Sequence, residues 1–93
     1  MSERERTFMF QREGGGEPEP ITINIDKTVK ELLDLYLQGK NLQGSFDEYA
    51  FMVGANPLKK DKFINCQIKS LRFLRPKAVI NVRVVDTKMG GRF

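Results

Sequence analysis

The strongest constraint on the fold is a change of hydrophobic period between residues 21 and 37. Apolar and polar residues alternate strictly over residues 21–25, which predicts a β-strand with three isoleucines on one face. The pattern then becomes helical, with apolar residues three or four positions apart in a single stripe. The stripe consists of Val29, Leu32, Leu33, Tyr36 and Leu37. We therefore expect an amphipathic helix that buries this stripe across a sheet.

Both ends of this helix carry recognisable residues. Thr28 and Glu31 have the spacing of a capping box, in which each side chain satisfies a free backbone N–H of the first turn. We expect the helix to begin directly after Thr28. Gly39 is expected to stop it in the left-handed conformation that glycine adopts without strain. Residues 41–47 are expected to be a loop.

A hairpin is predicted before the helix. Residues 7–12 read as a strand with Phe8 and Phe10 on its buried face, and residues 13–20 turn the chain back into the isoleucine strand. Three glycines in this turn do not make a phosphate loop, because three glutamates surround them and no Lys-Ser/Thr pair follows.

Two longer strands and one short strand are predicted after the helix. Residues 48–53 allow two orientations: either Tyr49, Phe51 and Val53 face inward, or Ala50 and Met52 do. Leu58 is expected to begin a short edge strand. Residues 78–85 are rich in β-branched side chains and form the final strand. In it Ile80, Val82 and Val84 are expected in the core, with Asn81 and Arg83 outside.

Charge is distributed unevenly along the chain. Residues 1–58 hold six Lys or Arg against ten Asp or Glu, a net −4, whereas residues 59–93 hold ten against two, a net +8. This split predicts a basic surface built by the C-terminal third. An acidic protein surface suits it better than nucleic acid. Among the aromatic residues only Phe73 is placed to stack on bases, and Phe73 is expected to pack inside.

The residue types present leave no candidate for catalysis. The chain has no histidine, so nothing activates Cys66 as a nucleophile, and we expect a buried structural thiol. The same composition excludes the usual zinc sites, and no cofactor is expected. The single cysteine suits a reducing compartment, no apolar run is long enough to span a bilayer, and residues 1–6 lack the hydrophobic stretch of a secretory signal. We expect a non-enzymatic cytosolic or nuclear protein.

The predicted order of elements is that of the β-grasp fold, and the final strand is expected to pair with the first because this protects two edges. At these elements the chain resembles ubiquitin and its relatives. The resemblance rests on the isoleucine strand, the helix start at residues 28–32, residues 51–54 followed by Leu58, the spacing of Phe63 and Ile68, and residues 82–84 followed by Gly90 and Gly91. It implies an α+β, ubiquitin-like β-grasp domain over residues 7–86, with a mixed sheet of four to five strands packed on one main helix. Residues 1–6 and 87–93 are expected to be flexible ends.

The resemblance also implies a role in binding other proteins. Relatives are recognised through the outer face of the sheet, and the likeness places Phe51 at the centre of that patch, with Arg83 where a valine is expected. The basic loop over residues 69–77 is longer than in ubiquitin and adds Lys69 and Arg72 to the predicted surface. The expected partners are proteins with an acidic surface.

Two alternatives stay open at this point. Gly90 and Gly91 resemble the diglycine of conjugated modifiers, which activating and conjugating enzymes join to lysine amines after cleavage behind the second glycine. Ras-binding domains share the β-grasp fold and present basic residues to an acidic edge of a small GTPase. In that case Lys69 and Arg72 would contact the GTPase.

Overall fold

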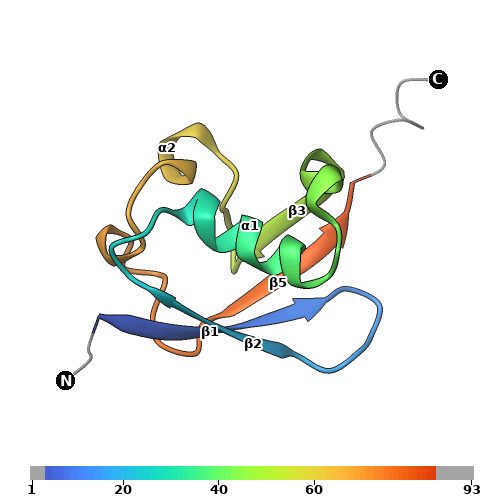
Figure 1. The fold of residues 1–93 in the computed structure, drawn as a ribbon, viewed down its shortest axis with the longest axis horizontal. Helices are drawn as coiled ribbons and strands as arrows, with labels where there is room; N and C mark the ends of the chain where they lie inside the picture. Colours follow the sequence, from blue (N-terminus) through green and yellow to red (C-terminus); the bar gives the residue numbers. More distant parts are fainter. Residues whose placement is uncertain (1–3, 86–93) are drawn as a thin grey trace.

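The computed structural model describes the backbone of residues 4–85 and the side chains of residues 4–42 and 46–85. The elements, shown in Figure 1, follow the predicted order, with short helices added in the segments without a clear period. They are β1 (Glu5–Arg12), β2 (Glu19–Asn24), α1 (Val29–Gly39), the 3-10 helix η1 (Gln43–Glu48), β3 (Tyr49–Val53), β4 (Asn56–Pro57), α2 (Asp61–Ile64), the 3-10 helix η2 (Ile68–Ser70) and β5 (Val79–Val84).

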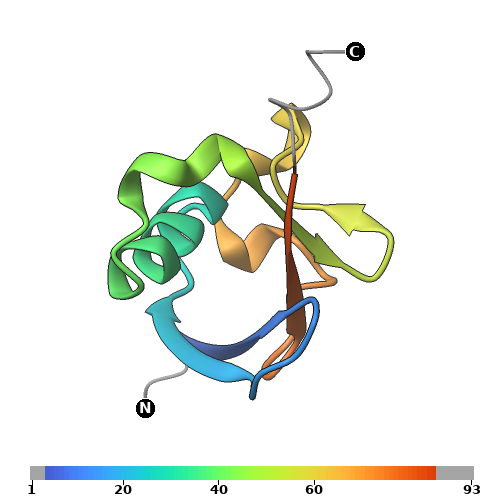
Figure 2. The ribbon, with the colours of Figure 1, turned by 90° about the vertical axis from the view of Figure 1, so that its right-hand side faces the viewer.

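The strands form a mixed sheet with the order β2-β1-β5-β3-β4. β1 pairs antiparallel with β2 and parallel with β5, where Met9 lies opposite Val79. β3 is antiparallel to both β5 and β4. The predicted placement of the final strand beside the first is therefore confirmed. Figure 2 shows the sheet curling around α1, so the core lies between them.

The core forms where the predicted stripe of α1 meets the inner face of the sheet. Every residue of that stripe is at most 2% exposed, and Phe8 and Phe10 of β1 are fully buried beneath it. Three rings meet at the centre. Phe10 stacks on Tyr36 with centroids 4.4 Å apart, and Phe51 stands edge-on to both, at 6.2 and 6.1 Å. Edge-on and offset aromatic pairs stabilise a core beyond the area they bury.

The start of α1 is as predicted, but its end is not. Thr28 Oγ1 accepts a hydrogen bond from the Glu31 N–H (3.2 Å), and the Glu31 carboxylate accepts one from the Thr28 N–H (2.8 Å). Gly39, however, is the last helical residue, and Asn41 takes the left-handed conformation with φ of 61°. Asparagine tolerates that conformation better than most side chains. The predicted loop after the helix contains η1.

β3 adopts one of the two orientations that its sequence allows. Phe51 is 1% exposed and faces α1, while Tyr49 and Val53 pack against the same core. Pairing with β5 sets this orientation, because Phe51 lies opposite the buried Val82. The inward prediction for Val84 is wrong: it is 65% exposed, since it ends β5 at the margin of the core.

The segment between β4 and β5 carries several buried anchors. Leu58 directly follows β4 and is fully buried, as are Ile68 and Leu74. The resemblance also implies a buried Phe63, because its spacing to Ile68 matches two buried family positions. In the structure Phe63 is only half-buried and sets its ring edge-on to Phe73 at 5.2 Å. The buried Leu74 thus anchors the long loop before β5 to the core, although no hydrophobic periodicity in the sequence predicts that Leu74 is buried.

Candidate functional site

The outer sheet face is the side of the sheet turned away from α1. Neighbouring residues of a strand point to opposite faces, so the buried Phe8, Phe51 and Ile80 fix which side chains point outward. We use the name outer sheet face for the outward residues of β1, β3 and β5, which are Thr7, Met9, Gln11, Ala50, Met52, Val79, Asn81 and Arg83. The assignment of Phe51 to the centre of this face is wrong, because its ring lies in the core.

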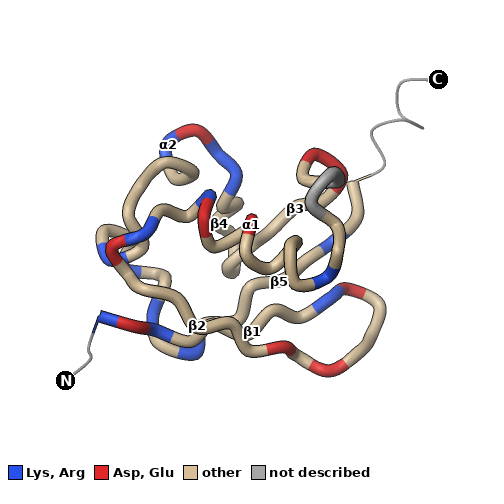
Figure 3. The backbone as a smooth tube through the Cα atoms, in the orientation of Figure 1, with Lys and Arg blue, Asp and Glu red and all other residues tan. Residues whose placement is uncertain are grey.

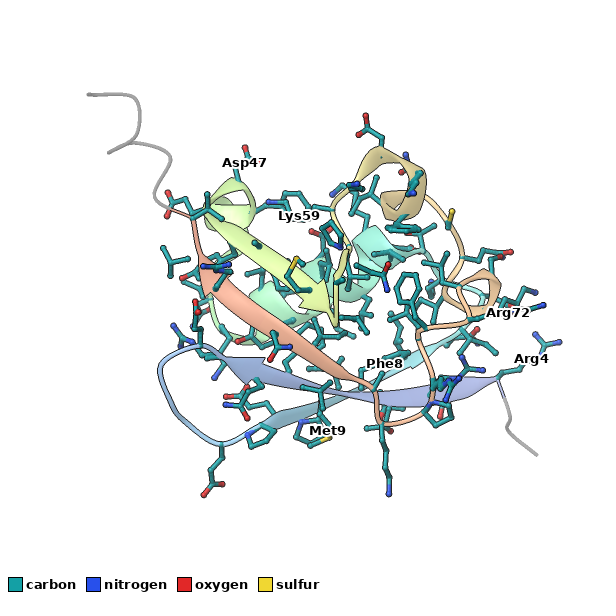
Figure 4. The ribbon with its side chains drawn as sticks, turned by 180° about the vertical axis from the view of Figure 1, so that it is seen from behind. Arg4, Phe8, Met9, Asp47, Lys59 and Arg72 are labelled. Carbon is teal, nitrogen blue, oxygen red and sulfur yellow. The ribbon has the colours of Figure 1, made fainter. Side chains whose placement is uncertain are left out.

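Apolar side chains nevertheless occupy part of this face. Met9 lies opposite Val79 across β1 and β5, and Val79 is 47% exposed. Met52 lies opposite Asn81 and beside Pro57 of β4. Figure 4 views the molecule from behind, with β3 and β5 in front of α1. Among the described elements, no helix packs on this side.

Arg83 points outward, as predicted. Its side chain is 58% exposed, and its Nε lies 3.3 Å from a carboxylate oxygen of Glu13 in the β1–β2 turn. Across the sheet Arg83 is opposite Ala50, a small residue that leaves the guanidinium accessible. It therefore forms the charged margin of an otherwise neutral face.

A second surface, the basic end, lies where β1 begins. It consists of Arg4, Arg6, Lys69, Arg72, Arg75 and Lys77, which come from two segments far apart in the sequence. Figure 3 shows blue segments gathered at this end and red segments along the β1–β2 turn at the other. The structure thus brings Lys69 and Arg72 together with residues of β1, and Figure 4 shows Arg4 and Arg72 at this same end.

Backbone contacts hold the basic end in place. The Ile68 N–H donates to the Lys27 carbonyl (2.9 Å) and the Lys77 N–H donates to the Thr7 carbonyl (2.6 Å), so both ends of the loop are fixed. Between them the Leu74 carbonyl accepts a hydrogen bond from Arg6 Nη1 at 2.7 Å. The cations therefore stand on an ordered frame.

Asp26 is a carboxylate held within this cationic cluster. Its two oxygens lie 2.8 Å from Lys69 Nζ and 2.9 Å from Arg4 Nη1. The hydrogen bond from Lys69, with a smaller contribution from Arg4, holds the pKa of Asp26 below its ordinary value of 3.8. The pKa of Glu31 in the helix cap is also lowered, chiefly by the backbone N–H of Thr28.

Acid titration is expected to reveal the Asp26 interaction. Because the folded-state pKa is lowered, the ion pairs stabilise the fold above about pH 3.8, and this stabilisation is lost as the pH falls through the lower folded-state value. Asp26→Asn should therefore flatten the fall in melting temperature below that pH, measured by circular dichroism. Part of the fall should remain, because Glu31 titrates in the same direction. Asp61→Asn makes the same change at an exposed carboxylate outside the cluster and serves as the matched control. Superimposable curves for Asp26→Asn and the wild type would contradict the assignment.

Lys59 lies in the basic C-terminal third of the sequence, but its ammonium group is occupied by contacts within the protein. Its Nζ donates to the carbonyls of Phe46 (2.7 Å) and Tyr49 (2.8 Å) and lies 4.5 Å from the centre of the Phe46 ring. Desolvation lowers the pKa of this amine. Lys30 of α1 sits over the same ring at 5.1 Å. Lys59 therefore ties η1 and the start of β3 to the segment that follows β4.

The remaining candidates are a metal site, Cys66, a depression over α1 and the diglycine. Within residues 4–85 no three His, Cys, Asp or Glu side chains gather to hold a metal ion, and the same residues contain no helix with the length and apolar character to cross a membrane. Cys66, expected to be buried, is half-buried, and its Sγ lies 3.1 Å from the Lys62 carbonyl. A depression of about 440 Å³ over α1 is lined by Glu31, Asp34, Leu35 and Gln38. Asp34 there is paired with Lys30 at 3.0 Å. Gly90 and Gly91 lie outside the described residues.

We compared the sequence and the fold of the chain with those of known proteins. No protein-family model matches the chain, and no curated protein matches it in sequence. Among solved structures, one described as "Molecular Mimicry of SUMO promotes DNA repair" is similar with a TM-score of 0.68 and 22% identity, over 88% of this chain and 94% of that one. The solution structure of the UBL domain of yeast Ddi1 is similar with a TM-score of 0.65 and 14% identity, over 90% and 93%. The chain is therefore a protein of the ubiquitin-like β-grasp fold.

Proposed function

We propose that this chain is a non-enzymatic interaction module that binds other proteins through its outer sheet face. The observation that carries the proposal is the exposed Val79 beside the half-buried Met9, on a face where no described helix packs. A sheet face turned to water usually carries polar side chains. Two neighbouring apolar residues there, with Met52 further across the face, favour a surface that a partner covers.

The composition of the face suits a protein partner. Methionine side chains adapt their shape to a contact, and Met9 and Met52 flank the polar Gln11 and Asn81. Arg83 stands at one margin, and arginine is enriched where proteins meet. Interfaces commonly combine apolar contacts with hydrogen-bonding side chains, as this face does. Arg83 also favours a partner with a carboxylate at the matching margin.

Arginine at position 79 is expected to abolish such binding. Val79→Arg places a charge in the middle of the apolar group, and a buried charge without a partner weakens an interface severely. The measurement is quantitative mass spectrometry of proteins captured from the native cell by wild type and variant. Leu35→Arg is the matched control, because Leu35 is another exposed apolar residue (38%), on α1. Circular dichroism should show that both variants remain folded.

The expected result is a set of proteins retained by wild type and Leu35→Arg and lost with Val79→Arg. Equal capture by all three proteins, or loss with Leu35→Arg alone, would contradict the proposal. The alternative role as a conjugated modifier rests on Gly90 and Gly91 in the sequence. It is compatible with the same surface, since the outer sheet face belongs to β1, β3 and β5.

A further inference from the structure

We propose that the basic end is a second docking surface, which takes an acidic segment, rich in Asp and Glu, from a partner protein. The basic end joins cations at the start of β1 to cations of the loop before β5. Arg4 and Lys69 share the carboxylate of Asp26, and Arg6 donates to the carbonyl of Leu74 in that loop. This surface adjoins the outer sheet face, since Lys77 lies two residues before Val79 and its N–H donates to the Thr7 carbonyl. It would bind through charge and not through the apolar pair, so the inference extends the proposed function.

Three of these cations are available to a ligand. Arg72, Arg75 and Lys77 are exposed, and within residues 4–85 none of them has an ion-pair partner. They follow one another along a loop whose frame is fixed by the buried Leu74 and by the hydrogen bond from Lys77 N–H to Thr7. A fixed frame reduces the entropy lost when a ligand binds.

One carboxylate of the chain itself is bound at this surface. Asp26 forms ion pairs with Arg4 Nη1 at 2.9 Å and with Lys69 Nζ at 2.8 Å, and these two cations come from segments far apart in the sequence. Arg72, three residues beyond Lys69, continues the same cationic surface without a carboxylate of its own. An acidic side chain from outside would therefore repeat at Arg72 and Arg75 the interaction that Asp26 makes with its neighbours.

The surface fits carboxylates better than nucleic acid. Proteins that bind single strands present exposed aromatic rings on which bases stack. The aromatic residue of this loop, Phe73, packs against the core and sets its ring edge-on to Phe63.

Binding of a labelled peptide of about eight glutamates tests the inference. We expect a fluorescence anisotropy signal at about 0.05 M salt that weakens at about 0.15 M, because salt screens exposed charges. Arg72→Glu combined with Arg75→Glu should weaken this binding roughly tenfold or more, since each attraction becomes a repulsion. Lys60→Glu combined with Lys62→Glu makes the same change in net charge at two exposed lysines elsewhere and should weaken it far less. If the double arginine variant fails to fold, Lys77→Glu alone replaces it, with a smaller expected loss.

The outcomes separate the possible explanations. Amide NMR shifts confined to residues 4–6 and 69–77, with the expected order of variants, would support the inference. Equal losses from both charge reversals would overturn it, because they would report net charge alone. It would also be overturned if the peptide did not bind, or if an oligothymidine of the same length or vesicles containing phosphatidylserine bound the same residues more tightly. Val79→Asn, which breaks the apolar pair without adding a charge, should leave peptide binding unchanged, so failure of the outer-face proposal would not be mistaken for failure here.

Discussion

Phe51→Ala is expected to lower the free energy of unfolding by about 3–5 kcal/mol, the usual loss when a buried phenylalanine is removed from a core. Phe51 is 1% exposed and closes the three-ring cluster with Phe10 and Tyr36, so alanine would leave a cavity lined by two aromatic side chains. A small domain is stable by only about 5–15 kcal/mol in total, and the variant should therefore be partly unfolded at moderate temperature. Urea denaturation followed by circular dichroism measures the loss.

Met52→Ala is the matched control for this experiment. Met52 is the next residue of β3 but points to the outer sheet face, where truncation removes far less buried surface. We expect a loss below about 1 kcal/mol. If Met52→Ala proved as damaging as Phe51→Ala, or if Phe51→Ala left stability unchanged, the orientation of β3 described above would be wrong.

Leu74→Ala is expected to cost about 2–5 kcal/mol, although the residue lies in a loop. Leu74 is fully buried, and its carbonyl accepts the hydrogen bond from Arg6 that ties the loop to β1. Truncation should loosen the frame of the basic end as well as the core. Urea denaturation gives the stability, and faster amide hydrogen exchange at Lys77, whose N–H bonds to Thr7, would report the loosened loop.

Arg72→Ala provides the comparison within the same loop. Its side chain is exposed, so stability should change by no more than about 0.5 kcal/mol. A loss below about 1 kcal/mol for Leu74→Ala, with unchanged exchange at Lys77, would show that the loop does not depend on this anchor.

The sequence was sufficient for the parts of the fold that local periodicity determines. The buried faces of β1 and of the capped helix can be read from a few consecutive residues, and the structure confirms them. The isoleucines of residues 21–25 pack against the same core and are half-buried. The helix cap and the apolar stripe that follows it favour the same helix, and such agreement between local signals disfavours other folds of this segment.

Predictions failed or stayed open where the orientation of a side chain depends on residues far away in the sequence. Alternation in β3 allows two faces, and only its pairing with β5 places Phe51 opposite Val82 in the core. Val84 continues the inward alternation of β5, yet the core ends before it. Leu74 has no periodic neighbours, so nothing in its local sequence marks it as buried. The basic end likewise needs the fold to bring Arg4 beside Lys69, 65 positions later in the sequence, through their shared contact with Asp26.

The central position of β5 in the sheet affects when the protein can fold during its synthesis on the ribosome. β5 is the strand that joins the β1–β2 hairpin to the β3–β4 pair, and it is synthesised last of the five. A nascent chain that has not reached residue 79 consists of two strand pairs with no sheet contact between them. Their aromatic residues then have no complete core to enter and stay open to aggregation or chaperone capture. Folding of this domain must therefore wait for β5 to leave the ribosome.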